Sequence, residues 1–339
     1  MIKTNRGVLM MHLYCSESTD PYYNLALEEY IFSNVKLDKG LFMLWQNDNA
    51  VVIGRNQNVM KEINLQYASK MNTRIARRNT GGGTVYHDLG NLNYSFIQDC
   101  DSRYSIDFKQ FAEPILDALN LLGVQAECNH RNDLVINGRK FSGTAQTVKN
   151  GRMLHHGTLL FNSDLDFVRK VLAVKDEVVQ GGGVKSVRSQ VTNISEHLLK
   201  SMSVNQFCDH LMASVSAKET TVFLQLTEKD YRAIEALKDS KYLTWDWTYG
   251  KAPHYKIQKV RNFGGGKLAL AMSVAKNGII DSITIDGDLL GPSNISQLEK
   301  LLTGKRLRKE DLQEVLSYCE VSDYITNLTS QELLEILMY

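Results

Sequence analysis

The hydrophobic and polar positions near the N-terminus predict one helix followed by two strands. YYNLALEEYIF, residues 22–32, carries apolar residues at roughly helical spacing, and Thr19-Asp20-Pro21 before it is a helix start signal. The runs LFMLWQ (41–46) and AVVIG (50–54) are short and apolar, and Asn47-Asp48-Asn49 between them is typical of a turn. We therefore predict a β-hairpin directly after the first helix.

The middle of the chain mixes further short apolar runs with helical stretches. We predict strands at residues 74–78, 84–87, 92–97, 133–137, 140–143 and 154–161. Helices at 114–123 and 164–172 interrupt them without the strict βαβ alternation of a doubly wound fold. The pattern predicts an α+β body with a mixed, largely antiparallel sheet flanked by helices.

The last third of the chain has a different rhythm, which predicts a second domain. Helical stretches at 206–215 and 228–242 are followed by the aromatic segment 245–255. Strands are then predicted around an Asn277-Gly278 turn, and three helices follow, at 295–304, 310–318 and 330–338. Because 339 residues exceed what one hydrophobic core usually serves, we predict a catalytic domain at 1–246 and a small α+β domain at 247–339.

The composition is that of a globular protein without a dominant charge. Lys and Arg total 39 against 38 Asp and Glu, so nothing indicates a general nucleic-acid or membrane surface. The five cysteines are scattered and show no CxxC spacing, which fits free thiols in a reducing compartment. No run approaches the ~20 apolar residues that span a bilayer, and the N-terminus lacks signal-peptide features, so we expect a cytoplasmic location.

The densest candidate for chemistry is the glycine-rich stretch ARRNTGGGTVYHDLGNLNYSF, residues 76–96. Three glycines, Gly81–Gly83, suit a position where a ligand approaches the backbone closely, and Arg77, Arg78 and Thr80 add donors for a phosphate or carboxylate. A tight glycine turn in a hairpin is the favoured explanation for the three glycines alone, but the adjoining arginines, His87-Asp88 and Asn91 favour a ligand site instead. The spacing is neither GxGxxG nor GxxxxGK[ST], so a dinucleotide fold and a P-loop are both unsupported.

A second cluster, RNDLVINGRKFSGTAQ (131–146), contains Lys140 after a turn at Asn137-Gly138. Most lysines are solvated surface charges, but Ser142–Ala145 beside it are small enough for close ligand approach. Acyl-adenylate formation needs a cation between a carboxylate and the α-phosphate, because two anions must meet. Lysine suits this task as a compact point charge. We expect the Lys140 amine to face a glycine-lined pocket near residues 78–87.

Two further stretches carry histidines or basic residues. In LHHGTLLF (154–161), strand alternation puts either His155 or His156 inward, where a packed core histidine is an equally good explanation. In GGGVKSVRSQVTNI (181–194), glycines precede Lys185 and Arg188. That pattern suits a loop that closes over an anionic intermediate, or simply a mobile loop.

Together, these motifs resemble the lipoate-protein ligase A family. RRNTGGGTVYHDLGNLNYSF, RNDLVINGRKFSG, HHGTLLF and SVRSQVTNI occur in the family's order, and YNLALEEY with WQNDNAVVIGRNQN agrees with its opening. The match extends from about Asn24 to Ile194. The tail from about Trp247 is similar, less specifically, to the accessory domain of the long bacterial form. The resemblance implies a catalytic body shared with biotin-protein ligases and a C-terminal domain that rotates during the cycle.

The resemblance also implies the activity. A ligase of this family uses ATP to convert lipoate, or octanoate, to lipoyl-AMP with release of pyrophosphate. It then transfers the lipoyl group to a specific lysine of an acceptor lipoyl domain. Expected acceptors are acyltransferase subunits of 2-oxoacid dehydrogenases and the glycine cleavage H protein. Mg²⁺ is expected because the charge of ATP must be neutralised, with Asp88 as a candidate ligand. A monomer without nucleic-acid or membrane partners is expected.

By resemblance, the site residues fall into two overlapping sets. ATP and the adenylate are expected at Arg78, Gly83, Thr84, Val85, Tyr86 and Lys140. Lipoate is expected at Thr80, Gly81, Gly82, His87, Asn132, Lys140, Ala145 and His156. Lys140 is the predicted catalytic residue; it stays protonated and acts electrostatically rather than as a general base. Val52, Ile53 and Gly54 would line a tunnel for the acyl chain, or simply belong to the core.

Three alternatives remain open at the level of sequence. A cofactorless lipoyl or octanoyl transferase needs an activated cysteine. Residues 140–161 contain none, no Pro-Cys-Gly motif occurs, and Cys128 is the only nearby candidate. A biotin ligase would carry a GRGRxGR signature, which is absent. A binding protein without turnover is disfavoured by the presence of Arg78, His87 and Lys140 together.

Overall fold

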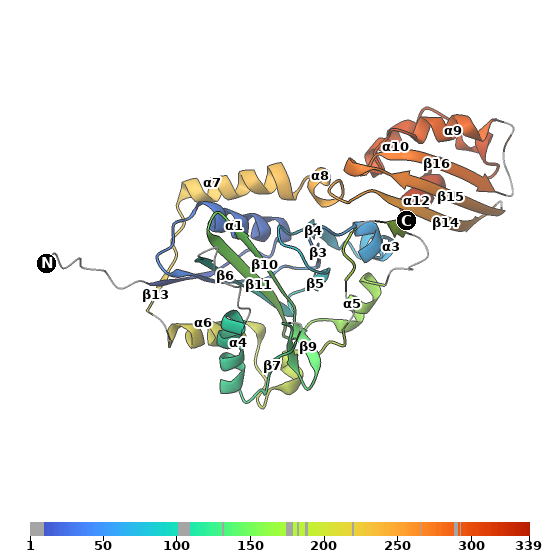
Figure 1. The fold of residues 1–339 in the computed structure, drawn as a ribbon. Coiled ribbons are helices and arrows are strands. Elements are labelled where there is room, and N and C mark those ends of the chain that lie inside the picture. Colours follow the sequence, from blue (N-terminus) through green and yellow to red (C-terminus); the bar gives the residue numbers. More distant parts are fainter. Residues whose placement is uncertain are drawn as a thin grey trace. The chain divides into compact units, whose positions relative to one another are not determined.

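The fold comprises two compact units (Figure 1). The computed structural model describes residues 10–100, 109–130, 132–173, 179–181, 183–186, 189–218, 220–264, 266–287, 291 and 293–339. Unit 1 consists of residues 1–55, 72–169 and 186–244, and unit 2 of residues 56–71, 170–185 and 245–339. The last division falls between Thr244 and Trp245, close to the predicted boundary between 246 and 247. Segments 56–71 and 170–185 group with unit 2 although they lie within the predicted catalytic range.

Unit 1 is built on a six-stranded sheet with the strand order β10-β11-β6-β2-β1-β13. The strands are β10 (Thr144–Lys149), β11 (Arg152–Leu160), β6 (Asn91–Asp99), β2 (Gly40–Trp45), β1 (Met11–Cys15) and β13 (Thr221–Phe223). Pairing is antiparallel from β10 to β2 and parallel from β2 through β1 to β13. The predicted strands at 41–46, 92–97 and 154–161 are confirmed, while β1, β10 and β13 were not predicted.

Helices cover both faces of this sheet. On one face, α4 (Lys109–Leu121) and α6 (Val204–Ser216) pack their apolar sides on the strands, with Phe111 and Phe207 fully inside the core. On the other face lies α1 (Pro21–Asn34), and α7 (Glu228–Leu237) packs against α1 (Figure 1). The predicted α+β architecture with a mixed, largely antiparallel sheet is confirmed.

Helix α1 begins where the sequence predicts. Asp20 is its N-cap and accepts a hydrogen bond from the Tyr22 backbone N–H at 3.0 Å, and Pro21 occupies the first turn, where its missing N–H is harmless. The helix buries Leu25, Leu27 and Ile31, as the spacing predicts. The same helix also buries the polar Glu28.

The predicted hairpin of residues 41–54 is wrong. β2 is bonded to β1 on one edge and to β6 on the other, which leaves no edge for β3 (Ala50–Ile53). β3 instead joins a separate three-stranded sheet between β4 (Arg74–Arg77) and β5 (Val85–His87). Asn47-Asp48-Asn49 is thus a connection between two sheets, and only Asn49 adopts a positive φ, of 41°.

A third small sheet carries the Lys140 motif. It contains β7 (Glu127–Cys128), β8 (Leu134–Ile136) and β9 (Arg139–Ser142), in that order. Asn137 and Gly138 form the β8–β9 turn with φ of 50° and 73°, values that Asn and Gly tolerate best. The predicted strands at 133–137 and 140–143 are therefore confirmed as a true hairpin.

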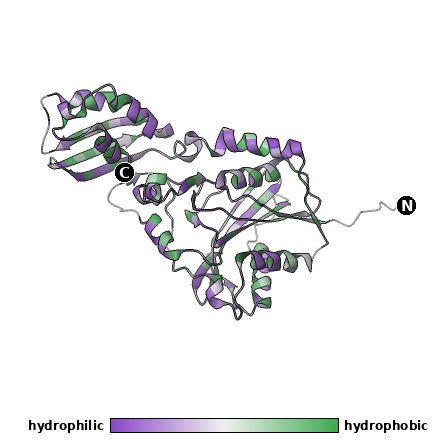
Figure 2. Cartoon of the chain, turned by 180° about the vertical axis from the view of Figure 1, so that it is seen from behind, coloured by the Kyte–Doolittle hydropathy of each residue, from purple (hydrophilic) through white to green (hydrophobic). Residues whose placement is uncertain are grey.

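Unit 2 combines a four-stranded sheet with a layer of helices. The strand order is β12 (Val179–Gly181), β14 (Tyr255–Phe263), β15 (Gly266–Val274) and β16 (Ile280–Gly287), all antiparallel. Buried and more exposed positions alternate along most of β14 and β15, and this sheet carries both hydrophilic and hydrophobic residues (Figure 2). The buried set packs against α9 (Ile295–Leu302), α10 (Lys309–Leu316) and α12 (Ser330–Met338). The predicted turn at Asn277-Gly278 and the three terminal helices are confirmed.

The remaining elements are short or irregular. They are α2 (Val59–Glu62), α3 (Leu65–Lys70), α5 (Leu165–Val171), the 3₁₀ turn at Ile194–His197, α8 (Trp245–Thr248) and α11 (Val321–Tyr324). The helix predicted at 228–242 ends as a π-helical turn at Lys238–Tyr242. No helix in the described part of the chain is long and apolar enough to cross a membrane.

Candidate active site

Arg78 holds the glycine-rich segment in shape. Its guanidinium donates to the carbonyls of Gly81 at 2.6 and 3.1 Å and of Gly83 at 2.7 Å, and to the Thr80 hydroxyl at 3.1 Å. A further bond reaches the Val52 carbonyl on β3 at 3.3 Å. The side chain is buried, and burial lowers its pKa to about 10. One charged fork thus ties the carbonyls of Gly81 and Gly83 to β3.

Close backbone packing explains why glycines occupy this segment. A Cβ on Gly54 would lie 2.1 Å from the Gly82 carbonyl oxygen, a distance that real side chains do not reach. Gly82 has a φ of 89°, and a Cβ there would meet the Arg78 guanidinium at 2.8 Å and the Ala145 methyl at 3.7 Å. The glycine segment is therefore packed between the end of β3 and the start of β10.

Beside the glycine segment, a buried polar network crosses the sheet. The Thr80 hydroxyl lies 2.8 Å from His156 Nε2, and His156 Nδ1 lies 2.9 and 3.0 Å from the two carboxylate oxygens of Glu28. Ser95 donates to Glu28 and accepts from the Trp45 indole N–H at 2.9 Å. The residues of this network are almost entirely buried, so its hydrogen bonds are strong and costly to break.

Strand register sets the two histidines on opposite faces. His156 pairs with Ala145 on β10 and with Ser95 on β6, so these side chains share the face covered by α1. His155 points the other way and stacks on Phe111 of α4 with ring centroids 4.6 Å apart. The prediction that one of the pair points inward is only half right, because both are buried, one in each layer.

His87 ends β5 within the same region. Its Nδ1 lies 3.0 Å from the Asn47 side-chain nitrogen Nδ2, and the Asn24 side-chain amide on α1 in turn donates to the Asn47 side-chain oxygen Oδ1 at 3.0 Å. Burial, with Arg78 and His156 nearby, lowers the pKa of His87 to about 3, so the ring is neutral. Its buried Nε2 has no partner among the described residues. A neutral ring with one open nitrogen is available to a polar ligand.

The residues after the glycines form β5 and are largely buried. The Thr84 backbone N–H donates to the Ser186 hydroxyl at 2.9 Å, so in this structure it is engaged within the protein. Val85 and Tyr86 pair with β3, and the Tyr86 ring packs on Phe167 with centroids 4.6 Å apart. These contacts order the segment that the sequence assigns to ATP.

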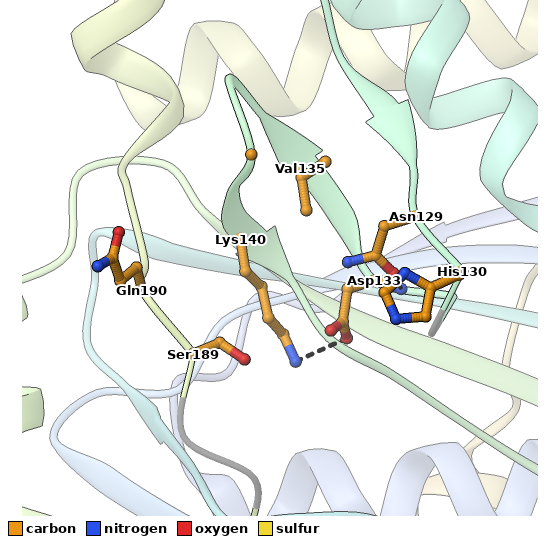
Figure 3. A pocket seen from close by; sticks show the side chains of 8 residues that line it. Asn129, His130, Asp133, Val135, Lys140, Ser189 and Gln190 are labelled. Carbon is orange, nitrogen blue, oxygen red and sulfur yellow. Dashed lines mark hydrogen bonds and ion pairs between the residues drawn. The ribbon is translucent and has the colours of Figure 1, made fainter.

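Lys140 lies in a pocket of about 130 Å³ (Figure 3). Its amine forms an ion pair with Asp133 at 2.7 Å, and its side chain is 27% exposed. The other lining residues are Asn129, His130, Val135, Gly138, Ser189 and Gln190. Figure 3 shows the amine and the carboxylate pointing at each other across the mouth of the hairpin. The lysine is thus held at a pocket rather than swinging freely in solvent.

The expectation that this pocket is lined by the glycine run is not met. Gly138 is the glycine that lines it, and no hydrogen bond or ion pair of Lys140 reaches residues 78–87 within the described part of unit 1. Two short segments nevertheless connect the regions. A Cβ on Gly143 would lie 2.9 Å from the Lys140 amine, and Ala145, two residues on, contacts Gly82.

The second connection is the segment from Ser186 to Gln190. The Ser186 hydroxyl accepts from the Thr84 backbone N–H at 2.9 Å and lies 3.1 Å from where a Cβ on Gly83 would be. The Gln190 carbonyl accepts from the Lys140 backbone N–H at 2.9 Å. Four residues span at most about 14 Å, which bounds the separation of the two regions. Arg188, proposed from the sequence as part of a closing loop, lies outside the described residues.

The structure thus gathers most predicted residues into one region and leaves two in another. Arg78, Thr80, Gly81, Gly82, Gly83, His87, Ala145 and His156 adjoin through the contacts above. Lys140 and Asn132 belong to the pocket side, where the Thr144 hydroxyl donates to the Asn132 carbonyl at 3.3 Å. Val52 and Ile53 are fully buried, which a core explains as well as a tunnel.

Four buried or half-buried polar residues of the site were not singled out from the sequence: Glu28, Ser95, Asn47 and Asp133. A carboxylate among the apolar positions of the first helix is the signal that could have identified Glu28. Asp133 lies within the quoted Lys140 motif, and the β8–β9 hairpin brings the two side chains together.

The other candidate ligands and nucleophiles have structural roles. Both carboxylate oxygens of Asp88 accept backbone N–H groups, from Gly90 at 2.9 Å and Asp164 at 2.8 Å. Among the described residues, no group of three or more His, Cys, Asp or Glu side chains could hold a metal. Burial raises the pKa of Cys128, the opposite of what a nucleophilic thiol needs.

Comparison with known proteins decides the family. The model of the lipoyl protein ligase A/B catalytic domain matches residues 20–216, and that of the bacterial lipoate protein ligase C-terminus matches residues 252–337. The chain belongs to the lipoate-protein ligase family. The family predicted from the four ordered motifs is therefore confirmed, and the chain is a ligase enzyme.

Curated relatives match this ligase over nearly its whole length. Lipoate-protein ligase LplJ of Bacillus subtilis is 38% identical, covering 94% of this chain and 97% of the relative. Lipoate–protein ligase 1 of Staphylococcus aureus is 37% identical with the same coverage. Both catalytic and C-terminal parts are thus shared with these relatives.

Solved structures share the fold of the ligase. A lipoate-protein ligase A bound with ATP and protein Ta0514 of T. acidophilum with bound lipoic acid each have a TM-score of 0.61 and 27% identity. Each alignment covers 72% of this chain and the whole of the other. An archaeal bipartite lipoate protein ligase, described together with its E2 lipoyl domain, has a TM-score of 0.62 and 28% identity.

Proposed function

We propose that this chain catalyses two coupled half-reactions. In the first, a carboxylate oxygen of lipoate, or octanoate, attacks the α-phosphate of ATP, and pyrophosphate leaves as lipoyl-AMP forms. In the second, the amine of a specific lysine on an acceptor lipoyl domain attacks the acyl carbonyl, and AMP leaves with the shared oxygen. The amine loses a proton, so the products are a lipoyl amide and AMP.

The observation that carries the proposal is the similarity to two solved ligases, one with bound ATP and one with bound lipoic acid. The chain aligns over the full length of both, at 27% identity. A fold that accommodates both substrates in relatives supports the same pair of substrates here. The acceptor class rests on the archaeal ligase described with its E2 lipoyl domain.

In this proposal, Lys140 allows the two anions to meet. Its ammonium is already ordered by Asp133 at 2.7 Å, and the pair is only partly exposed to water. An arriving carboxylate and phosphate would compete with Asp133 for the amine, so that the cation shifts from the protein carboxylate to the reacting oxygens. Preorganised charge in a partly desolvated position lowers the barrier more than the same charge in water.

The acyl part of the substrate is assigned to the sheet face that carries Ala145 and His156. Ala145 lies between Gly82 and His156, and its methyl side chain is small, so it leaves space on that face for an acyl chain. This supports the assignment. Glu28 and Thr80 fix the orientation of His156 from both ring nitrogens. The open Nε2 of His87 is the proposed donor or acceptor for the polar end of the ligand.

The glycine segment is assigned to the nucleotide. Glycines at 81–83 admit a phosphate close to the backbone, while Arg78 keeps their carbonyls turned toward its own guanidinium. In this proposal, Arg78 contributes by holding the glycine segment in its conformation. Mg²⁺ is proposed to enter with ATP and to neutralise its phosphates, since this ion takes many of its ligands from phosphate and water.

Several finer points keep the status of predictions. They are the preference for lipoate or octanoate, the choice among 2-oxoacid dehydrogenase subunits and glycine cleavage H protein, the monomeric state and the cytoplasmic location.

A direct assay tests the proposed function. The chain is incubated with ATP, lipoate and a purified lipoyl domain, and the intact mass of the domain is measured. We expect a gain of one lipoyl group that requires ATP and is accompanied by pyrophosphate. The matched control replaces the acceptor lysine of the domain by arginine and should show no gain. Acyl transfer without ATP would contradict the proposal and favour a transferase.

A further inference from the structure

Two cysteines outside the candidate active site lie in direct contact. Cys15 is the last residue of β1 and Cys208 lies on α6, and their Sγ atoms are 3.8 Å apart although 193 residues separate them. Both are free thiols; Cys15 is exposed and Cys208 is half-buried. Cys128 and Cys319 instead have their sulfurs beside backbone carbonyls. The two sulfurs therefore meet at a place that a small reagent can reach through the exposed Cys15.

We propose that Cys15 and Cys208 form a site of reversible oxidation, at which a small-molecule disulfide such as oxidised glutathione converts the two thiols into an intramolecular disulfide. This modification site is independent of the ligase reaction. The bond would join the end of β1, which lies next to the edge strand β13, to a helix on one face of the sheet.

The geometry requires only a small adjustment. A disulfide has a sulfur–sulfur distance of about 2.05 Å, so the two sulfurs must approach by less than about 2 Å. The exposed position of Cys15 at the end of β1 gives its side chain room to rotate. Cys208 follows the fully buried Phe207, which fixes this turn of α6 on the core. The helix thus presents Cys208 at a defined position, and Cys15 supplies the movement.

The chemistry proceeds in two displacements. The Cys15 thiolate attacks one sulfur of the small disulfide, forms a mixed disulfide and releases one small thiolate. Cys208 then loses its proton to solvent, and its thiolate attacks Cys15 Sγ and displaces the second small thiolate. Two protein thiols are oxidised and one small disulfide is reduced to two thiols, so the electrons balance.

The local electrostatics favour Cys15 as the first nucleophile. The hydrogen bond from Cys208 lowers the pKa of Cys15, although burial and the nearby Asp209 and Glu17 oppose this. The same hydrogen bond is the main reason that the pKa of Cys208 is raised. Once Cys15 has become a mixed disulfide it carries no charge to hold the Cys208 proton. The second thiol is therefore released for attack only after the first has reacted.

Thiol mapping on the intact chain tests the proposal. The folded protein is treated with oxidised glutathione, remaining thiols are alkylated, and the chain is digested without reductant for mass spectrometry. We expect loss of two of the five thiols and a cross-linked peptide pair containing Cys15 and Cys208, both reversed by dithiothreitol. The same treatment in concentrated urea should abolish the preference for this pair, because the folded contact creates it.

Variants identify the order of events. Cys208→Ser should accumulate glutathione on Cys15 without a cross-link, and Cys15→Ser should form no cross-link at all. Cys319→Ser, the matched control in unit 2, should give the cross-link as in the unchanged chain. Stable glutathione on Cys15 in the unchanged chain, a different cysteine pair, or disulfide-linked dimers through Cys15 would each overturn the proposal.

Discussion

His156 Nδ1 lies 2.9 Å from the carboxylate of Glu28, although 128 residues separate the two in the chain. The contact fixes the histidine ring on the sheet face that also carries Ala145, while Thr80 holds the other ring nitrogen. Glu28 is next to Glu29 on α1, but Glu29 accepts instead from Lys241 at 2.6 Å and from Tyr242. Substitution of Glu29 is therefore a matched control for substitution of Glu28, because only Glu28 contacts His156.

Glu28→Gln should weaken use of the acyl substrate. The glutamine amide offers one oxygen acceptor and an NH₂ donor in place of two carboxylate oxygens, so His156 loses its orientation. We expect a rise of about tenfold in the KM for lipoate in pyrophosphate release. Glu29→Gln should change this KM by less than about twofold. Equal effects of the two substitutions would mean that α1 as a whole, and not the contact with His156, supports the site.

Gly54→Ala should destabilise unit 1 strongly. A methyl group there would lie 2.1 Å from the Gly82 carbonyl oxygen, so β3 and the glycine segment must move apart. We expect a loss of about 2 kcal/mol or more in the free energy of unfolding measured with urea. Gly81→Ala, where a Cβ meets nothing within 4 Å, should stay within about 0.5 kcal/mol. A well-tolerated Gly54→Ala would show that the segment is not packed as described.

Arg78→Lys should not be conservative. A single ammonium cannot replace the bonds to Gly81, Gly83 and Val52, and we expect a loss of about 3 kcal/mol in the free energy of unfolding in the absence of ATP. Arg169→Lys, in an exposed pair with Asp166, is the control and should change stability by less than about 1 kcal/mol. If Arg78→Lys weakened only ATP binding at unchanged stability, Arg78 would contact the nucleotide instead of bracing the loop.

Stability should fall in mild acid because of His87. Burial lowers its pKa to about 3 in the folded chain, so the unfolded chain binds a proton more readily as soon as the pH falls below about 6.5. The stabilisation of the folded chain by the neutral His87 ring is complete above about pH 6.5 and is lost progressively as the pH falls toward about 3. Between pH 7 and pH 5 this one ring should account for a loss of about 2 kcal/mol.

Urea unfolding of His87→Gln at the two pH values checks this. The variant should be less stable at pH 7 but lose about 2 kcal/mol less than the unchanged chain on going to pH 5. The pKa of His155 is lowered to about 3 as well, so part of the acid dependence should remain. If His87→Gln lost as much stability between the two pH values as the unchanged chain does, His87 would not be buried as a neutral ring.

The elements that could be predicted have strong local signals. The Asp20 cap and helical spacing defined α1, and Asn277-Gly278 defined the β15–β16 turn. β10 was not predicted because its sequence TAQTVK is mostly polar and half-exposed, with no alternating apolar face. The hairpin of residues 41–54 failed for another reason. Local turn chemistry does not show that β1 and β6 already occupy both edges of β2.

The part of the site that lies within one continuous sequence motif could be predicted. Arg78, Thr80 and the glycines belong to one segment, and their mutual contacts follow from its turn. The partners of Glu28 and Asn47 could not be predicted, because these residues reach His156 and His87 only through the packing of α1 and of the β2–β3 connection on the sheet. The position of Glu28 among the apolar residues of α1 indicates that its carboxylate is buried, but the local spacing does not show which side chain it meets.

The account depends most on the charge of Lys140. Lys140→Ala should abolish lipoate-dependent pyrophosphate release from ATP while leaving the fold intact, as judged by circular dichroism and urea unfolding. Lys218→Ala removes a lysine from an exposed pair with Asp117 and is the matched control, expected to release pyrophosphate at the unchanged rate. Substantial lipoate-dependent pyrophosphate release by folded Lys140→Ala would contradict the central claim.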